Sequence, residues 1–364
     1  MRTRSLLIIG AAAVLALLAA AWVSSLRTPD PASAQPGPLA PGLSEALDAV
    51  TRVRIIAAGD TVLATLERDE GGWRLAEKGG YRVDVEKLRD LLSSIAAARR
   101  VEAKTALSER HVQLGVEDVA ADDAHGVRVD ITTPQKTWSY IVGDNLARGS
   151  GTYVRATGEA QSWLIGSNLA VERSPANWLV KRIIDVGANR IASIAVAPET
   201  SAGFRLVRSD GDPASDFVFA TLPRGRKAAE GGYQREALAG VLSGLMFEDV
   251  FPDADMPAPE TTRSTQFLLD DGRRVTVRSW QQEGRTFATF AMTLDEDAAA
   301  AWIARQPVPE AGDDADAAPV VTLDALAAEV AGFQETHGDW VYALPTFKAS
   351  NLNKELEDYL EPEK

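Results

Sequence analysis

Apolar and polar residues follow two different periods along this chain of 364 residues. Several short segments carry apolar side chains at about every second position, which is typical of strands with one buried face. Other segments repeat apolar residues every third or fourth position, as an amphipathic helix does. Because the segments are short and turn residues separate them, we expect antiparallel sheets with few helices, an α+β fold.

The period of two predicts strands in two regions of the chain. In the first region they are Val53–Ala57, Thr61–Arg68, Trp73–Ala76, Val101–Lys104, Val127–Thr132, Thr137–Val142, Thr152–Ala156 and Ser162–Ile165. In the second region they are Ile191–Ala197, Phe204–Val207, Phe217–Leu222, Thr265–Leu269, Arg274–Trp280 and Phe287–Leu294. Helical spacing predicts a helix capped by Asp84, and further helices at Asn177–Val186, Glu236–Phe247, Leu323–Gln334 and Asn351–Leu360.

The two regions resemble each other. Gly79-Gly80-Tyr81 recurs as Gly231-Gly232-Tyr233, and a helix with similarly spaced apolar residues follows each. We therefore expect two tandem copies of one antiparallel sheet-plus-helix unit. The boundaries that follow are an anchor at 1–27, a proline-rich spacer at 28–42, the first copy at 43–170, a linking helix at 171–190, the second copy at 191–296, and helices with a strand that dock on it at 297–364.

The most apolar segment of the chain is Leu6–Val23, which contains no charge and no proline. As a helix it is about 27 Å long, close to the thickness of a bilayer's hydrocarbon core. Arg2 and Arg4 precede it, and positive charge stays on the cytoplasmic side. The pattern predicts a single-pass membrane anchor, with the N-terminus in the cytoplasm and the bulk of the chain on the other side of the membrane.

A cleaved signal peptide is the alternative interpretation. Ala32-Ser33-Ala34 matches the A-x-A pattern of a cleavage site. However, the apolar run is longer than the roughly 7–15 residues of a signal peptide, and the A-x-A lies well past its end. We favour the uncleaved anchor, and both interpretations export the rest of the chain.

Charge and cysteine content limit the possible functions. The net charge is −14, which disfavours nucleic acid as a partner because phosphate contacts need lysine and arginine. The chain has no cysteine, so disulfides, thiolate catalysis and cysteine-ligated zinc are excluded.

No motif in the sequence predicts a catalytic, cofactor or metal site. His111, His125 and His337 lie far apart, without the spacing of zinc ligands. Gly149-Ser150-Gly151 lacks the flanking pattern of a nucleophile elbow, and we interpret it as a turn. The phosphate-binding and dinucleotide-binding glycine patterns are absent.

Two other groups of residues invite a functional interpretation. The clusters Asp122-Asp123 and Asp313–Asp316 lack the frame of a calcium loop, so solvated loops are the better interpretation. The tryptophans on predicted strands are able to bind sugar rings or a partner, although packing in a core is their commoner use. They are Trp73, Trp138, Trp163, Trp280 and Trp340.

The repeated frame resembles a family of bacterial envelope proteins of unknown function. The resemblance is carried by Gly72-Trp73, Gly80-Tyr81, Val101–Lys104, Ile141–Gly143 and Thr152–Arg155. Such a resemblance implies one N-terminal transmembrane helix, a repeated extracytoplasmic domain, and genes often found beside ABC transporters of the gliding-motility type. It implies no catalytic residues.

We therefore expect a non-enzymatic, membrane-anchored periplasmic accessory protein. Its expected partners are the inner membrane, through Leu6–Val23, and the subunits of an ABC-type transport or envelope complex. The alternatives are an envelope hydrolase acting on glycan or peptide, and a module that binds glycans or other ligands.

Overall fold

The computed structural model describes residues 36–198, 202–212, 214–306 and 321–362. The chain divides into two compact units, Met1–Leu179 and Val180–Lys364. The anchor predicted at Leu6–Val23 and the acidic cluster Asp313–Asp316 lie outside the described residues. Within the described ranges, no helix is long and apolar enough to cross a membrane.

A ten-stranded antiparallel sheet forms the first unit, in the order β1-β6-β10-β9-β8-β7-β2-β3-β4-β5. Its strands are β1 (Gly37–Pro38), β2 (Arg52–Ala57), β3 (Thr61–Asp69), β4 (Gly72–Leu75), β5 (Tyr81–Arg82), β6 (Arg99–Ala103), β7 (Val127–Thr132), β8 (Thr137–Asn145), β9 (Thr152–Ala156) and β10 (Ser162–Ile165). All the strands predicted for this region are confirmed, and the antiparallel α+β class with them.

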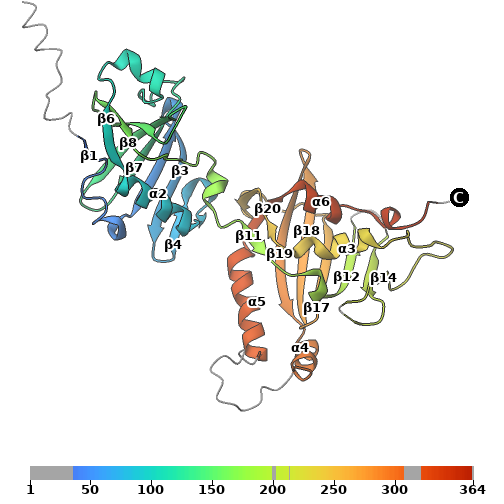
Figure 1. Cartoon of the computed structure of the whole chain (residues 1–364). Coiled ribbons are helices and arrows are strands. Elements are labelled where there is room, and N and C mark those ends of the chain that lie inside the picture. The colour runs from blue at the N-terminus through green and yellow to red at the C-terminus, as the bar shows by residue number, and fades with distance from the viewer. Residues whose placement is uncertain (1–35, 199–201, 213, 307–320, 363–364) are drawn as a thin grey trace, which may run out of the picture. The chain divides into compact units, whose positions relative to one another are not determined.

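One helix, α2 (Val85–Ala97), lies across one face of this sheet (Figure 1). Asp84 caps it, because its side chain accepts a hydrogen bond of 3.2 Å from the backbone N–H of Lys87. Four of its apolar side chains are buried at helical spacing, as predicted: Leu88, Leu91, Leu92 and Ile95. Shorter 3₁₀ turns complete the unit at η1 (Leu47–Ala49), η2 (Ala58–Asp60), η3 (Ala76–Lys78), η4 (Ser108–Leu114) and η5 (Pro175–Trp178).

Part of the predicted spacer belongs to the fold. Of residues 28–42, the described ones include β1, whose Gly37 and Pro38 pair with Arg100 and Arg99 of β6. Leu39 is buried, and its backbone N–H donates to the carbonyl of Ala98. The spacer predicted at 28–42 therefore ends earlier than expected, because Leu39 and Ala40 at its C-terminal end are buried in the first unit.

The second unit contains an eight-stranded antiparallel sheet in the order β14-β13-β12-β17-β18-β19-β20-β16, and a two-stranded sheet of β11 and β15. The strands are β11 (Arg182–Ile184), β12 (Ile191–Ala197), β13 (Phe204–Arg208), β14 (Phe217–Phe219), β15 (Leu245–Met246), β16 (Asp249–Pro252), β17 (Arg263–Leu269), β18 (Arg273–Gln282), β19 (Arg285–Leu294) and β20 (Trp340–Leu344).

Its helices are α3 (Tyr233–Ala239), α4 (Glu296–Ile303), α5 (Leu323–His337) and α6 (Thr346–Leu352), with 3₁₀ turns η6 (Ala188–Arg190), η7 (Gly240–Leu242) and η8 (Leu356–Tyr359). The helix predicted at Leu323–Gln334 is confirmed by α5. The helix predicted at Asn351–Leu360 is wrong, because α6 ends at Leu352 and only the short turn η8 follows.

Two of the predicted helices include residues that form the two-stranded sheet of β11 and β15. The linking helix at Asn177–Val186 is wrong: η5 ends at Trp178, and β11 runs through the β-branched residues Ile183 and Ile184. The helix at Glu236–Phe247 is only partly right, because α3 ends before Gly240 and the chain then turns into β15. Strands β11 and β15 pair with each other although they are far apart in the sequence. The local spacing of apolar residues in each segment therefore could not predict this pairing.

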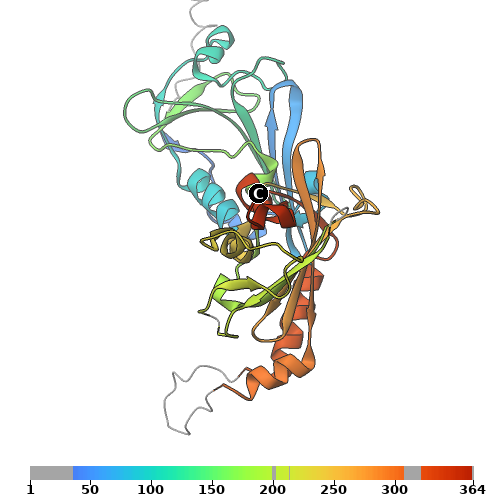
Figure 2. The same ribbon diagram turned by 90° about the vertical axis from the view of Figure 1, so that its right-hand side faces the viewer.

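Helix α5 packs along β19 (Figure 2). Strand β20 pairs with β19 only from Thr286 to Ala288, which leaves the remainder of that edge without a strand partner. The side chain of Gln334 on α5 accepts from the backbone N–H of Met292 on this edge. The helix thus covers an edge that would otherwise offer backbone groups to another chain.

When the two-residue end strands β1 and β5 are left out, the two sheets share one order of strands. In the first unit the order runs β4-β3-β2-β7-β8-β9-β10-β6, and in the second β14-β13-β12-β17-β18-β19-β20-β16, with every neighbouring pair antiparallel. In the first unit α2 comes after β4 and the short strand β5, and in the second unit α3 comes after β14.

Candidate functional site

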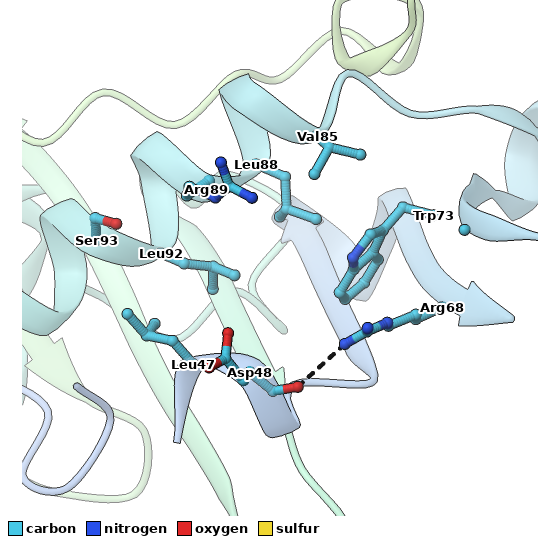
Figure 3. Close-up of a pocket in the computed structure, with 10 residues that line it drawn as sticks. Leu47, Asp48, Arg68, Trp73, Val85, Leu88, Arg89, Leu92 and Ser93 are labelled. Atoms are coloured by element: carbon cyan, nitrogen blue, oxygen red, sulfur yellow. Dashed lines mark hydrogen bonds between the residues drawn. The ribbon is translucent and has the colours of Figure 1, made fainter. Parts of the chain in front are cut away.

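A pocket of about 460 Å³ opens in the first unit between α2, the β3–β4 hairpin and η1 (Figure 3). This volume lies within the range of about 300–1,000 Å³ that is usual for ligand sites. Apolar, aromatic and charged side chains line it together. They are Leu47, Asp48, Arg68, Gly72, Trp73, Val85, Leu88, Arg89, Leu92 and Ser93.

The turn of the β3–β4 hairpin places Trp73 in this pocket. Asp69 accepts a hydrogen bond of 2.8 Å from the backbone N–H of Gly71, and Gly72 has φ +113°, a conformation that side chains disfavour. The turn sets Arg68 directly opposite Trp73 in the register of the two strands. The carbonyl of Trp73 accepts from the N–H of Val83, which fixes the strand from its other side.

Helix α2 supplies the facing wall of the pocket. Its lining residues recur at helical spacing, so they form one stripe along the helix. Leu88 and Leu92 are buried and form the floor, whereas Val85 keeps 41% of its surface exposed. In Figure 3 the indole of Trp73 lies between Arg68 and the α2 side chain Leu88. The pocket therefore offers an apolar wall at a point that solvent reaches.

The charged side chains of the pocket differ in whether they bind another residue of the chain. Arg68 donates through Nη1 to the backbone carbonyl of Asp48 at 3.0 Å, which leaves the Asp48 carboxylate out of that bond. Arg89 makes no hydrogen bond or ion pair with any described residue. Two guanidinium groups and one carboxylate leave an excess of positive charge. The site suits a ligand that carries an apolar or aromatic part and an acidic group.

The three histidines have separate local roles. His111 is buried with its Nε2 2.9 Å from the carbonyl oxygen of Ala160. The Nδ1 of His125 lies 3.0 Å from the carboxylate of Glu117. His337 is buried, and its Nδ1 lies 2.7 Å from the hydroxyl of Tyr342. Among the residues that the structure describes, no group of three or more His, Cys, Asp or Glu is arranged to hold a metal.

The remaining residues that the sequence singled out lie in loops. Ser150 lies just before β9, and its hydroxyl donates to the carbonyl of Gly166 at 3.4 Å. Asp122 and Asp123 are exposed in the segment that follows η4. Neither group reaches the pocket at Trp73.

One family model matches a segment that includes parts of both units. A family model described as a domain of unknown function, DUF4340, matches residues 73–264, more than half of the chain. The chain belongs to this family. No curated protein and no solved structure matches the chain.

The DUF4340 match begins at the pocket tryptophan, Trp73, and ends in β17 of the second unit. It includes the whole α2 wall of the pocket but leaves out Arg68 and Asp48. Within this DUF4340 protein the tryptophans differ in environment. Trp138, Trp163 and Trp280 are at least nine-tenths buried, as in core packing, whereas Trp73 and Trp340 are half-buried.

Sequence reasoning singled out Trp73 but not its two arginines. The sequence does contain a pattern that could have identified each arginine. Arg68 is the residue that a tight hairpin brings opposite Trp73, and Arg89 lies four residues after Val85 on the helix stripe. What the sequence does not show is that the stripe and the hairpin face each other.

Proposed function

We propose that this DUF4340 protein is a non-enzymatic accessory protein, held at the inner membrane and facing the periplasm, that docks on a component of an ABC-type transport or envelope complex. The observation that carries the proposal is the pocket at Trp73. It combines an indole, an aliphatic helix stripe and two guanidinium groups at a surface that a partner's side chains can enter. Aromatic and arginine side chains are the groups that most often dominate protein interfaces.

The side chains of the pocket are suited to binding rather than to chemistry. The guanidinium groups of Arg68 and Arg89 carry only N–H donors and therefore serve as hydrogen-bond donors, not as bases. Asp48 is exposed, and Ser93 has no imidazole or amine beside it among the lining residues. The best-supported occupant is a peptide segment of a partner that places an apolar residue against Trp73 and an acidic residue near Arg89.

The predicted anchor would keep such a docking site close to partners in the membrane. A helix at Leu6–Val23 confines the body to a thin layer above the bilayer, which raises its effective concentration at any membrane partner. The acidic exported part is repelled by anionic lipid headgroups, so the anchor rather than the surface supplies the membrane contact.

The proposal includes a tandem origin for the two units. The common strand order of the two sheets supports it. So do the glycine pairs, because Gly79, Gly80, Gly231 and Gly232 all have positive φ and precede the helix of their own unit. On this proposal the first copy carries the docking pocket, and the second copy diverged around its own surface.

The experiment is an affinity capture from membranes solubilised under conditions that preserve complexes. The full chain with Trp73→Ala and the full chain with Arg89→Glu are compared with the unaltered protein. Arg148→Glu is the matched control, because Arg148 is exposed between β8 and β9, makes no hydrogen bond or ion pair with any described residue and is absent from the pocket lining.

We expect the unaltered chain and the Arg148→Glu variant to recover transporter subunits, and both pocket variants to lose them by about tenfold or more, as the truncation of a hot-spot residue does. Equal recovery by all four chains would show that the pocket is not the docking site. Recovery of no transport or envelope component by the unaltered chain would reject the proposed function.

A further inference from the structure

A small pocket of about 130 Å³ lies on one face of the eight-stranded sheet of the second unit, across β13, β12, β17 and β18. The side chains that alternate with its lining residues along these strands, such as Ile194, Phe267 and Val275, are fully buried in the core. The pocket therefore lies on the face that is turned away from the core. It is lined by Ser193, Ala195, Arg205, Gln266, Leu268 and Arg274.

The register of the strands places these side chains together. Ala195 of β12 pairs with Arg205 of β13 on one side and with Gln266 of β17 on the other. Leu268, two residues after Gln266, pairs with Arg274 of β18. Residues that pair directly, and residues two apart on one strand, point to the same face of a sheet. The two arginines therefore stand at opposite ends of one pocket, with β12 and β17 between them.

Both arginines keep hydrogen-bonding capacity for a ligand. Arg205 is exposed, and its side chain makes one hydrogen bond to a described residue, from Nη2 to the hydroxyl of Ser193 at 3.3 Å. The side chain of Arg274 is 41% exposed, and its Nη2 lies 3.7 Å from a carboxylate oxygen of Asp295, which is itself 42% exposed. Such an exposed pair is weak, and the two guanidinium groups leave an excess of positive charge beside it.

The rest of the lining adds donors and room. Ser193 and Ala195 have the short side chains of the set, so the sheet is hollowed between the arginines. The hydroxyl of Ser193 accepts from Arg205, and its own O–H is therefore able to donate. Gln266 is exposed and brings an amide with two further N–H donors. Donors from three side chain types around one hollow favour an anion.

The size of the hollow limits the anion to a small group. Pockets that enclose a whole ligand usually measure about 300–1,000 Å³, so a hollow of about 130 Å³ accommodates one functional group. A phosphate group carries a charge of about −1.5 to −2 near neutral pH and offers three strong acceptor oxygens. This charge matches two guanidinium groups, each of which is able to donate to two oxygens at once.

We infer that this pocket binds a phosphate group, whose oxygens accept from Arg205 at one end and from Arg274 at the other. Inorganic phosphate, a soluble phosphate ester and a phospholipid headgroup share this chemistry. The inference rests on the second unit alone and is independent of the docking pocket at Trp73, which takes a ligand with an apolar part.

The test uses the full chain in octyl glucoside, an uncharged detergent without phosphate, at low ionic strength. Inorganic phosphate, glycerol phosphate and the water-soluble lipid dihexanoyl phosphatidic acid are titrated by phosphorus NMR and calorimetry, with acetate as the monoanionic probe. We expect saturable binding of the phosphate compounds that is tighter than binding of acetate and weakens as sodium chloride is added. The phosphate compound that binds most tightly identifies the source of the group.

Arginine variants locate the binding. Arg205→Gln and Arg274→Gln each remove one charged donor group and should weaken phosphate binding by about threefold to tenfold. Arg278→Gln is the matched control, because Arg278 lies on the same face of β18, four residues after Arg274, but is absent from the pocket lining. It should leave binding unchanged.

Three results would overturn the inference. They are the absence of saturable binding for all three phosphate compounds, binding of acetate as tight as that of phosphate, and a loss in Arg278→Gln equal to the loss in the two pocket variants. The last result would show that phosphate responds to the charge of the whole face and has no site at the pocket.

Discussion

The hydroxyl of Tyr140 donates a hydrogen bond of 2.9 Å to the backbone carbonyl of Leu39. Both residues are buried. Beside this bond, Trp138 donates through Nε1 to the carbonyl of Pro41 at 3.0 Å. These two contacts join the segment after the predicted anchor to β8 in the middle of the first sheet. The segment is therefore held to a central strand of the sheet.

The first prediction concerns that bond. Tyr140→Phe keeps the ring and leaves the carbonyl of Leu39 without this donor, so we expect the free energy of unfolding to fall by about 1–3 kcal/mol. Urea denaturation followed by tryptophan fluorescence measures it. Tyr153→Phe is the matched control, because no hydrogen bond of the Tyr153 hydroxyl joins it to a described residue, and it should be nearly neutral. An equal loss in both variants would contradict the role of Tyr140.

The second prediction concerns alkaline pH. Burial raises the pKa of the Tyr140 hydroxyl from 10.0 to about 12. Between these two values the unfolded chain loses this proton while the folded chain keeps it, so folding stability declines as the pH rises. The decline is at most about 1.4 kcal/mol per pH unit for one proton. Comparing the stability of the unaltered chain and Tyr140→Phe from pH 8 to 12 isolates it, and identical slopes would contradict the prediction.

The third prediction concerns Asp271, whose side chain is 1% exposed and contacts Arg273 at 2.6 Å and Arg190 at 2.8 Å. Burial alone would raise the pKa of Asp271, but hydrogen bonds and charge from the two arginines hold this pKa below its ordinary value of 3.8. The carboxylate therefore stabilises the fold above pH 3.8, and this contribution is lost as the pH falls through the lowered pKa.

Asp271→Asn should lower the free energy of unfolding at pH 7 by about 1.5–3 kcal/mol, because it removes the charge of a buried hydrogen-bond acceptor while Arg190 keeps Asp270 and Arg273 keeps Glu329 as partners. The exposed Asp253 supplies the control, Asp253→Asn, which should be neutral. Acid titration of stability below pH 4 should be shallower in the Asp271→Asn variant than in the unaltered chain. A steeper titration would show that the sign of the pKa shift is wrong.

The fourth prediction contrasts two glycines. At Gly143 a Cβ atom would collide with the backbone oxygens of Leu114 and Gly115, so Gly143→Ala should destabilise the first unit by more than 1 kcal/mol. Gly332 lies inside α5, and a Cβ there meets nothing within 4 Å. Gly332→Ala should therefore stabilise the second unit by about 0.5–1 kcal/mol. Thermal denaturation of both variants compares the signs, and stabilisation by Gly143→Ala would contradict the packing.

Local patterns in the sequence predicted most of the fold. Alternation identified strands such as Thr152–Ala156 with their observed bounds, and the cap at Asp84 identified α2. The failures occur where long-range pairing overrides helical spacing. Leu245 continues the apolar stripe of α3, yet it lies in β15, because its backbone pairs with β11.

The candidate site depends still more on long-range contacts. Trp73 is visible in the sequence as a tryptophan after two glycines, but its pocket exists only because α2 faces the hairpin. Arg263 and Glu355 are 92 residues apart along the chain, and no spacing rule joins them. Their pairing depends on the chain after α6 folding back onto the start of β17.

The central claim is that the chain stays at the membrane through an uncleaved Leu6–Val23 helix. Its most direct test is the intact mass of the native protein recovered from the producing cells after membrane fractionation. The account predicts a membrane-bound polypeptide of the full 39.0 kDa. A freely soluble polypeptide whose N-terminus is Gln35 would contradict it.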